Sequence, residues 1–281
     1  MHPATLFLAS LALVMSNTFA QTPLERGKYL VEGVLTCGNC HTPRGPGGVL
    51  DTAKRHAGGP QVWETAEYKV RPTNITPDKE TGIGGWTPEQ VKAAIHDGKR
   101  PNGQQLSPQM PYGFYKIFTP SDLDAVVAYV LAQPAVSQKV EPPVYKVKRM
   151  RLDIPPGAEK PLPASAMKDP AKRGFYLATI GHCMECHTPM VNGHRDFKNG
   201  LGTGGERFEG PWGVSVSRNI TPHKEHGLGA WSDDEIKRAI TQGVRKDASK
   251  LKPPMGFGWY ATMNDADLAA IVAYLRTIPA R

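Results

Sequence analysis

Apolar residues recur at the spacing of an amphipathic α-helix in several short segments of the chain, with polar residues between them. Between residues 119 and 133, the apolar face consists of Leu123, Val126, Val127, Val130 and Leu131. Between residues 264 and 278, it consists of Leu268, Ile271, Val272 and Leu275. Spacings of three and four residues place such side chains on one face of a helix. No convincing run of strands is found, so the pattern predicts an all-α protein with long loops.

Start and stop signals mark three helices in each half of the chain. Thr22-Pro23-Leu24-Glu25 is a capping box with proline at the first helical position, and Thr87-Pro88-Glu89-Gln90 has the same form. Gly98 and Gly243 stop the second helix of each half. The six helices are expected to begin at Thr22, Thr87, Thr119, Asp169, Ser232 and Asn264.

The second half of the chain repeats the first. Arg26-Gly27-Lys28-Tyr29-Leu30 is matched 147 residues later by Arg173-Gly174-Phe175-Tyr176-Leu177. The offset is 146 at the cysteines and then settles at 145. At this last offset, Asn74-Ile75-Thr76-Pro77, Trp86, Met110 and Tyr129 match Asn219-Ile220-Thr221-Pro222, Trp231, Met255 and Tyr274. Such an internal duplication predicts two tandem modules of similar fold.

The repeat divides the chain into a first module at residues 21–138, a connector at 139–167 and a second module at 168–281. The connector is rich in proline, including Pro142-Pro143, Pro155-Pro156 and Pro161-Leu162-Pro163. Repeated prolines favour an extended, semi-rigid chain, so we interpret this segment as a passive spacer. A connector that lies across both modules is the alternative.

Residues 1–20 have the form of a signal peptide for export. The apolar stretch from Ala4 to Met15 is too short to span a bilayer, and Thr18-Phe19-Ala20 offers small residues before a cleavage site. We therefore expect a periplasmic protein whose signal peptide is cleaved before Gln21. Retention of the segment as an anchor is the alternative, because it contains no Lys or Arg.

A Cys-x-x-Cys-His motif occurs at matching places in both halves. The two copies are Cys37-Gly38-Asn39-Cys40-His41 and Cys183-Met184-Glu185-Cys186-His187. Two thiols on one face of a helical turn can add to the two vinyl groups of a haem, and the adjacent histidine then reaches the iron. The motif predicts two covalently attached haem c groups. A redox-active dithiol within each pair and a zinc site shared by all four cysteines are the alternatives.

The second axial ligand of each iron is expected to be a methionine. Of the nine methionines, only Met110 and Met255 coincide under the repeat, and each lies in a loop rich in turn residues. His and Met are common axial ligands of haem iron, and Met raises the reduction potential. The alternative is that these methionines only pack in the core. The predicted metal ligands are His41, Met110, His187 and Met255.

Other histidines fit a duplicated site poorly. Under the repeat, His56 corresponds to Leu201 and His96 to Thr241. His182 is adjacent to a cysteine of the motif and is expected to point elsewhere. We expect the three remaining histidines to face solvent in loops; they are His194, His223 and His226.

Three further motifs give weaker indications of function. Trp86 and Trp231 precede helix starts and are expected either to donate to a haem propionate or to anchor the helix in the core. The Asn-Ile-Thr segments at 74–76 and 219–221 have the form of glycosylation sites, but a structured loop beside the haem fits an exported bacterial protein better. The glycines at 200, 202 and 205 match a dinucleotide fingerprint, which we reject because no strand precedes them.

Composition and charge narrow the class of partner. The chain has 281 residues, 40% of them hydrophobic, which is enough for packed cores. The formal net charge is +8, but the Lys and Arg residues are scattered rather than clustered. Nucleic-acid binding requires a basic patch and is therefore not expected. A positive surface fits an acidic redox partner or peripheral association with an anionic membrane.

The two Cys-x-x-Cys-His motifs, Asn74-Ile75-Thr76-Pro77-Asp78, Gly84-Gly85-Trp86 and the loops of Met110 and Met255 resemble those of class I c-type cytochromes. They are most similar to the multihaem cytochrome c subunits of periplasmic dehydrogenases that oxidise alcohols, aldehydes or sugar acids. The resemblance covers essentially all of the chain after the signal segment. It implies two tandem cytochrome c-type modules, each with three main helices and long loops around a haem.

The resemblance, together with two axial ligands on each iron, favours electron transfer over catalysis, because no coordination position stays open for a substrate. We expect the protein to accept electrons from a periplasmic dehydrogenase and to pass them to a cytochrome or terminal oxidase. No catalytic residue is found outside the haem sites. The alternative is a dihaem enzyme, such as a peroxidase or a thiosulfate-oxidising cytochrome, which would need two unequal haems.

Overall fold

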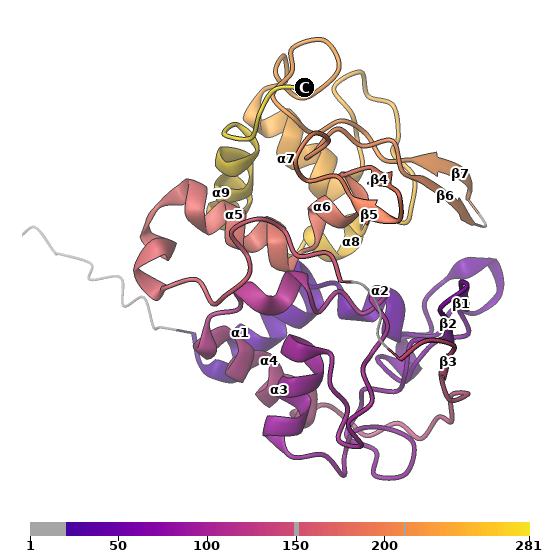
Figure 1. Ribbon diagram of the computed structural model, residues 1–281. Coiled ribbons are helices and arrows are strands. Elements are labelled where there is room, and N and C mark those ends of the chain that lie inside the picture. The colour runs from indigo at the N-terminus through magenta and orange to yellow at the C-terminus, as the bar shows by residue number, and fades with distance from the viewer. Residues whose placement is uncertain (1–20, 149–151, 211) are drawn as a thin grey trace, which may run out of the picture.

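The computed structural model describes residues 21–148, 152–210 and 212–281. The signal peptide predicted at residues 1–20 lies outside this part of the chain. Two helical halves lie one above the other, and each has short strands at the same side of the molecule (Figure 1). We call residues 22–138 the first half and residues 168–281 the second half.

The helices of the first half begin where the sequence predicts. They are α1 (Pro23–Tyr29), α2 (Cys37–His41), α3 (Pro88–Asp97) and α4 (Pro120–Ala132), with 3-10 turns at Pro46–Gly48, Thr52–Lys54 and Phe114–Ile117. Both predicted capping boxes form, at Thr22 and at Thr87. Gly98 ends α3 with a φ of 63°, in the left-handed region that glycine adopts without strain.

The second half repeats this order of elements. A 3-10 turn at Ala164–Lys168 precedes α5 (Pro170–Ile180), α6 (Cys183–Cys186), α7 (Asp233–Gln242), α8 (Phe257–Tyr260) and α9 (Asp265–Leu275). The side chains of Asp169, Ser232 and Asn264 each accept a backbone hydrogen bond at a helix start. The predicted starts of all six main helices are therefore confirmed.

A π-helical turn distinguishes the first helix of the first half from its counterpart. The chain continues from α1 through the π-helix η1 (Leu30–Val34), whereas α5 is a regular α-helix. From the arginine to the first cysteine, the first half has one more residue than the second, which is why the repeat offset drops from 147 to 146. A π-turn absorbs one extra residue without ending the helix. The insertion places Glu32 in this turn.

A close helix crossing forms the centre of each half. Helix α1 packs against α4, and α5 packs against α9. Gly27 lies against the carbonyl of Ala125, and Gly174 lies against the carbonyl of Ala270. A side chain at either glycine would overlap that carbonyl oxygen, so glycine is what lets the two helices approach.

Short strands are the feature that the sequence pattern missed, and the prediction of a purely helical chain is wrong in this respect. The strands are β1 (Trp63–Glu64), β2 (Tyr68–Val70), β3 (Val144–Tyr145), β4 (Met190–Val191), β5 (His194–Arg195), β6 (Arg207–Gly210) and β7 (Gly213–Val216). Antiparallel pairs join β1 to β2, β2 to β3, β4 to β5 and β6 to β7. Strands of two to four residues are too short to produce a detectable alternation. The mostly helical class is confirmed.

The connector contacts both halves, so its interpretation as a passive spacer is wrong. Strand β3 extends the hairpin of the first half, and the Leu162 amide donates to the carbonyl of Ile117. Asp153 accepts hydrogen bonds from the backbone and side chain of β5 in the second half, at Arg195 N and His194 Nδ1. The connector thus fixes how the halves are placed.

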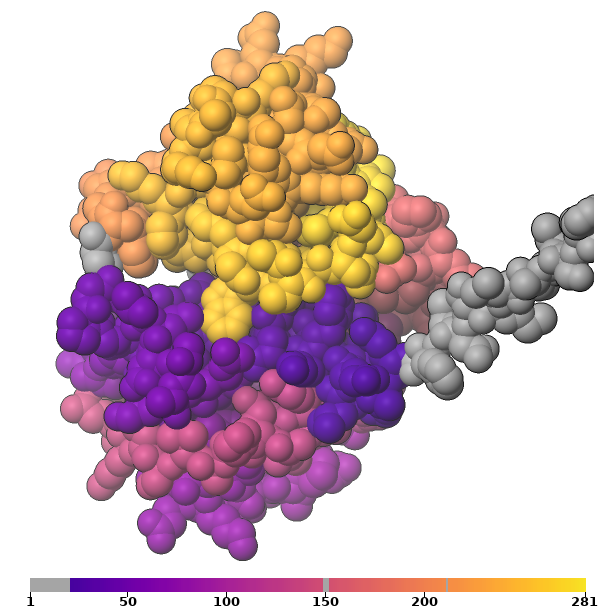
Figure 2. Space-filling view, turned by 180° about the vertical axis from the view of Figure 1, so that it is seen from behind, coloured from indigo at the N-terminus to yellow at the C-terminus, as the bar shows by residue number. Residues whose placement is uncertain are grey.

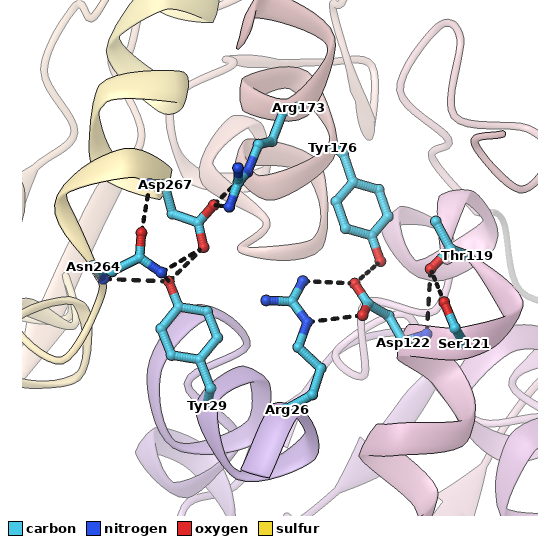
Figure 3. A network of polar contacts seen from close by, with 9 residues as sticks. All are labelled: Arg26, Tyr29, Thr119, Ser121, Asp122, Arg173, Tyr176, Asn264 and Asp267. Atoms are coloured by element: carbon cyan, nitrogen blue, oxygen red, sulfur yellow. Dashed lines mark hydrogen bonds and ion pairs between the residues drawn. The ribbon is translucent and has the colours of Figure 1, made fainter. Parts of the chain in front are cut away.

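A reciprocal polar network joins the two halves (Figure 3). Tyr29 of the first half donates from its hydroxyl to Asp267 of the second at 2.6 Å, and Tyr176 of the second donates to Asp122 of the first at 2.7 Å. The two tyrosines correspond under the repeat, and so do the two aspartates. The contact is therefore nearly two-fold symmetric, as in an interface between identical subunits.

Each aspartate also pairs with an arginine of its own half. Arg26 donates to both carboxylate oxygens of Asp122 at 2.8 and 2.9 Å, and Arg173 approaches Asp267 Oδ1 at 2.5 Å. Asp267 is fully buried and Asp122 is 6% exposed. Buried charges are tolerated when they are paired and hydrogen-bonded, as these are. The network therefore ties α1, α4, α5 and α9 into one structure.

One hydrophobic core extends through both halves. It includes Val31 and Phe118 from the first half and Leu177 and Ile271 from the second. The rings of Phe118 and Tyr176 meet edge to face, with centroids 6.3 Å apart, across the contact. The space-filling view shows the second half seated directly on the first (Figure 2).

Candidate functional site

The two Cys-x-x-Cys-His motifs form equivalent helical turns. Each turn follows a residue in the left-handed region, Thr36 with φ 50° before α2 and His182 with φ 43° before α6. Within each turn the two cysteines are three residues apart and lie on the same side of the helix. The local geometry is therefore suited to attachment of one planar group through two sulfurs.

The motif histidines are oriented by the same kind of hydrogen bond. His41 donates from Nδ1 to the carbonyl of Thr73 at 2.7 Å, and His187 donates from Nδ1 to the carbonyl of Arg218 at 2.6 Å. A carbonyl can only accept, so Nδ1 carries the hydrogen and Nε2 keeps a lone pair. A backbone carbonyl at the second nitrogen is a common support for a metal-bound imidazole.

Burial keeps both imidazoles neutral. It lowers the pKa of His41 to about 4, although the hydrogen bond to Thr73 acts in the opposite direction. Burial also lowers the pKa of His187. A histidine must be neutral at the nitrogen that binds a metal, so both side chains are in the form that ligation requires.

The cysteines are in an environment that suppresses thiolate chemistry. Burial raises the pKa of Cys37 to about 12, that of Cys40 to about 11 and that of Cys183 to about 11. Burial and the nearby Glu185 carboxylate also raise the pKa of Cys186. Redox-active dithiols have lowered thiol pKa values, so the environment opposes that alternative.

The structure describes all four cysteines and joins none of them in a disulfide. Among the described residues, no three His, Cys, Asp or Glu side chains come together in an arrangement that could hold a metal ion. A zinc site built from both motifs therefore has no counterpart in this part of the chain.

The two candidate methionines lie in matching turns. Met110 follows α3 and precedes the 3-10 turn at Phe114–Ile117, and Met255 lies directly before α8. The amide of Tyr112 donates to the Met110 carbonyl at 2.7 Å, and the amide of Phe257 donates to the Met255 carbonyl at 3.1 Å. Both side chains are half-buried. Met110 packs against the core, so the alternative of simple packing stays open for this residue.

Two tyrosines lie near the cysteines, Tyr115 buried and Tyr260 half-buried, and the sequence analysis did not select them. Burial and then the charge of Cys37 raise the pKa of Tyr115, and burial and then Cys183 raise that of Tyr260. Each hydroxyl is thus close to the thiols of its own half. The two tyrosines correspond at the offset of 145, which is the signal that could have found them.

The Asn-Ile-Thr-Pro segments are turns, as predicted. Asn74 Oδ1 accepts from the backbone and hydroxyl of Thr76, and Asn219 Oδ1 accepts from the same groups of Thr221. Asn74 is only 2% exposed and its amide donates to the Val136 carbonyl at 2.8 Å. A buried, hydrogen-bonded amide is a poor glycosylation acceptor, so Asn74 is structural; the half-buried Asn219 donates from Nδ2 to the Arg281 carbonyl at 2.6 Å.

The remaining histidines differ in their surroundings. His56 is fully buried, and His194 is half-buried with Nδ1 2.8 Å from Asp153, so the expectation that His194 faces solvent is wrong. His182 pairs with Glu185 at 3.1 Å. The rings of His223 and His226 stack on each other, with His226 exposed and His223 half-buried.

Buried N–H groups that lack a hydrogen-bond acceptor indicate whether a haem would fit this protein. Among the described residues, Arg100 Nε in the first half and Trp212 Nε1 and Arg238 Nε in the second are buried and make no hydrogen bond. A buried N–H group without an acceptor is costly, and haem propionates are strong acceptors. The donors therefore suit a group that carries carboxylates. Trp86 and Trp231 pack against the core, which agrees with the predicted role of anchoring the helices that follow them.

The two candidate sites meet at the contact between the halves. Asn39 of α2 donates from Nδ2 to the carbonyl of Pro254 at 3.3 Å, next to Met255. Gly38 of α2 lies against the indole of Trp259, where any side chain would overlap the ring. The first cysteine motif is therefore in direct contact with the methionine loop of the second half.

No helix within residues 21–148, 152–210 and 212–281 has the length and apolar character needed to cross a bilayer.

Comparisons with known proteins agree with this geometry. The family model for cytochrome c matches residues 171–279, which is the second half. The chain is 32% identical over 271 residues to the fructose dehydrogenase cytochrome subunit of Gluconobacter japonicus, covering 92% of this chain and 53% of that protein. It is 29% identical over 298 residues to an alcohol dehydrogenase (quinone) cytochrome c subunit of Gluconacetobacter polyoxogenes, covering 98% and 61%.

A third relative is close to this chain in length. The chain is 29% identical over 254 residues to a diheme cytochrome c-type protein of Cereibacter sphaeroides, covering 87% of this chain and 82% of that protein. By contrast, the chain spans between about half and two thirds of the two dehydrogenase subunits.

Proposed function

We propose that the chain is a dihaem electron carrier, because its second half matches the family model for cytochrome c and its relatives include cytochrome c subunits and a diheme cytochrome c-type protein. Each half holds one haem c through its Cys-x-x-Cys-His motif. The haem irons supply one-electron redox chemistry. In this proposal, Cys37, Cys40 and His41 hold one haem, and Cys183, Cys186 and His187 hold the other.

The single observation that carries the proposal is the matched pair of histidine hydrogen bonds. His41 and His187 each donate Nδ1 to a backbone carbonyl at 2.7 and 2.6 Å, which leaves Nε2 of each ring for the iron. The same support in both halves favours the same ligation in both. Met110 and Met255, which lie in matching turns, would supply the second ligand of each iron.

The electron donor in this proposal is a periplasmic dehydrogenase. Relatives carry the names of cytochrome subunits of fructose, alcohol and gluconate dehydrogenases, which supports a dehydrogenase as electron donor. Oxidation of a substrate by a dehydrogenase of this kind releases two electrons, and each of the two haems would accept one of them. The acceptor is a cytochrome or terminal oxidase of the periplasmic side. A formal charge of +8 favours encounter with acidic partners, with rates that fall as salt rises.

A dihaem peroxidase or thiosulfate-oxidising enzyme is the competing function. Such an enzyme needs an iron with an open or different sixth position. The loops of Met110 and Met255 have the same turn and the same place in the repeat. This similarity supports two closed irons.

Ligand replacement tests the proposal. In the holoprotein, Met110→Leu and Met255→Leu are each expected to change the absorption spectrum of one haem and to permit carbon monoxide binding there. The double variant should change both. Met263→Leu is the control, because Met263 is a buried methionine that the proposal leaves unligated. Exchange of Met for Leu conserves volume, so folding is largely retained.

Two outcomes contradict the proposal. A pyridine haemochrome spectrum that shows no thioether-linked haem would contradict the proposed attachment of two haems. Rapid turnover of peroxide by the reduced wild-type protein would favour the enzyme instead.

A further inference from the structure

The two halves carry equivalent β-hairpins, which project at the same side of the molecule (Figure 1). In the first half β1 pairs with β2, and Glu64 lies opposite Lys69. In the second half β6 pairs with β7, and Glu209 lies opposite Val214. Both members of this pair are related by the offset of 145, so the register itself confirms the match. The two hairpins can therefore be compared residue by residue.

A third strand covers the outer edge of the hairpin in the first half. Strand β3 of the connector pairs with β2, with Val144 opposite Lys69, and the Lys146 amide donates to the Glu67 carbonyl at 2.7 Å. Among the described residues, β7 has β6 as its single partner strand. The edge of β7 that corresponds to the covered edge of β2 is therefore open.

The backbone groups of Val214 and Val216 point to this open edge. The Ser217 amide donates across the hairpin to the Glu206 carbonyl at 2.9 Å. Bonding groups alternate between the two edges of an antiparallel strand, so the residues one and three positions before Ser217 face outward. In agreement, the Val214 carbonyl accepts a long hydrogen bond from Lys252 Nζ at 3.5 Å. A third strand could form main-chain hydrogen bonds at these positions.

The side chains along the open edge are apolar, whereas those of the covered edge are charged. Val214 and Val216 are 40% and 43% exposed. Their counterparts are Lys69 and Arg71, and Arg71 pairs with Glu141 of the connector at 2.9 Å. Proteins commonly place charged side chains on an uncovered edge strand, because such a strand otherwise pairs with other chains. Strand β7 does the opposite, which is expected of an edge that receives a partner.

The surroundings of the open edge are basic. Lys250 and Lys252 are exposed, and Lys252 reaches the backbone of β7. Their counterparts in the first half are the uncharged residues Gln105 and Ser107. Isolated strand bridges that involve Gln105 and Lys250 occur at matching positions, which confirms the comparison. A segment that lies along β7 therefore meets two lysines, and acidic side chains would complement them.

The open strand leads directly to the second candidate site. Two residues after Val216, the Arg218 carbonyl accepts the Nδ1 hydrogen of His187 at 2.6 Å. The Gly204 amide, shortly before β6, donates to the His187 carbonyl at 2.9 Å. Trp212, between the two strands, has a buried indole N–H without an acceptor among the described residues. The hairpin is thus part of the structure that holds the proposed iron ligand.

We propose that the outer edge of β7 binds an extended acidic segment of the redox partner, which joins the hairpin as a third strand in the way that β3 does in the first half. That the partner exchanges electrons rests on the proposed function. Main-chain hydrogen bonds to Val214 and Val216 give affinity, and acidic side chains opposite Lys250 and Lys252 give selectivity and a faster encounter. The partner therefore docks beside the haem of the second half.

Binding of a model peptide to the holoprotein tests the proposal. The probe is the peptide of residues 141–148 with Lys146→Glu and Lys148→Glu, which keeps the sequence of β3 and is acidic. In an NMR titration, the amide signals of Val214 and Val216 should shift and their hydrogen exchange should slow. The Lys69 amide should not respond, because β3 already covers it. Added salt should weaken binding, and the same peptide with its own lysines should bind more weakly.

Variants separate this edge from general charge attraction. Lys250→Gln with Lys252→Ser introduces the residues of the first half and should weaken binding about twofold to thirtyfold, which corresponds to two exposed ion pairs. Lys168→Gln with Lys172→Gln is the matched control, because it removes the same charge from exposed positions at the opposite side of the second half (Figure 1). Val216→Pro removes an outward amide and should abolish strand addition.

Three outcomes would overturn the inference. The first is that the acidic peptide leaves the Val214 and Val216 amides unchanged. The second is equal binding by the wild type and the variant at Lys250 and Lys252. The third is a wild-type dimer that Val216→Pro converts to a monomer in sedimentation, because the edge would then bind a second copy. A protein with two covalent haems that binds no peptide keeps the proposed function, whereas peptide binding without covalent haem keeps only the docking edge.

Discussion

The first and second halves use the same residues to cross their helices and to bind each other, but they differ around the first cysteine motif. Tyr29 and Asp122 in the first half have the same roles as Tyr176 and Asp267 in the second. The π-turn that carries Glu32 occurs only in the first half. The difference shows that a duplicated fold can keep its helix packing and its cysteine motif while one copy gains charged side chains beside that motif.

Symmetry is retained where the two halves depend on each other. A change in Tyr29 would leave Asp267 of the other half with one partner fewer, so the network constrains both copies together. The region around Glu32 and His56 makes no contact of this reciprocal kind, and it is there that the copies diverge. The predictions below test this comparison.

The largest effect is expected from the buried aspartates. Asp267→Ala removes the partner of Arg173 and Tyr29, and Asp122→Ala removes the partner of Arg26 and Tyr176. Breaking a fully buried pair costs about 3–5 kcal/mol, and the cost here should be at or below the lower end of that range because the arginines left behind are 21% and 35% exposed. The free energy of unfolding, from denaturant titration of the holoprotein, should fall by a similar amount in both variants.

Asp265→Asn is the control for this experiment, since Asp265 is exposed on the same helix as Asp267. If Asp122→Ala and Asp267→Ala differ by several kcal/mol, the two halves are not equivalent at their contact.

The glycines at the helix crossings should give the next largest effect. Gly27→Ala and Gly174→Ala each place a methyl group against a backbone carbonyl, of Ala125 or Ala270. Overpacking of this kind costs about 1–3 kcal/mol. Thermal unfolding should show similar decreases in Tm for both variants. Gly85→Ala is the control, because the added methyl group would meet open space and Gly85 has no positive φ. Gly103 also faces open space, but its φ of 82° would strain an alanine. A Tm unchanged by Gly27→Ala would contradict the close crossing.

The smallest effect is expected from the single hydrogen bond between the cysteine motif of one half and the methionine loop of the other. Asn39→Ala removes the donor to Pro254 and also the Oδ1 acceptor of Arg44 Nη2, at a cost of about 0.5–1.5 kcal/mol for each bond. Because Pro254 adjoins Met255, the spectrum of the second haem should respond as well as that of the first, whose motif contains Asn39. A response confined to the first haem would contradict the contact described here.

Much of the fold follows from short segments of sequence. The six main helix starts at Thr22, Thr87, Thr119, Asp169, Ser232 and Asn264 are confirmed, because a cap depends on residues three apart. The strands were missed because two to four residues carry no measurable pattern. The role of the connector was misjudged, since its proline content says nothing about what Asp153 and Leu162 contact.

The sequence likewise predicted some residues of the candidate site and missed others. The sequence indicated both cysteine motifs and their histidines, and the repeat singled out Met110 and Met255. It did not reveal Tyr115 and Tyr260, whose positions near the cysteines result from packing. His56 was set aside because the repeat at an offset of 145 pairs it with Leu201. The structure corrects this pairing, since the amides of His56 and Gly202 donate to the equivalent hydroxyls of Thr42 and Thr188.

By itself, the sequence determined the helices, the duplication and the attachment motifs, because each of these depends on neighbouring residues or on comparison of the chain with itself. Only the tertiary structure decided that Tyr29 meets Asp267 and that His56 meets Glu32 and Gln133. Tyr29 and Asp267 are 238 residues apart in the chain, and His56 and Gln133 are 77 apart. Contacts over such separations depend on how the helices pack, and no local pattern encodes them.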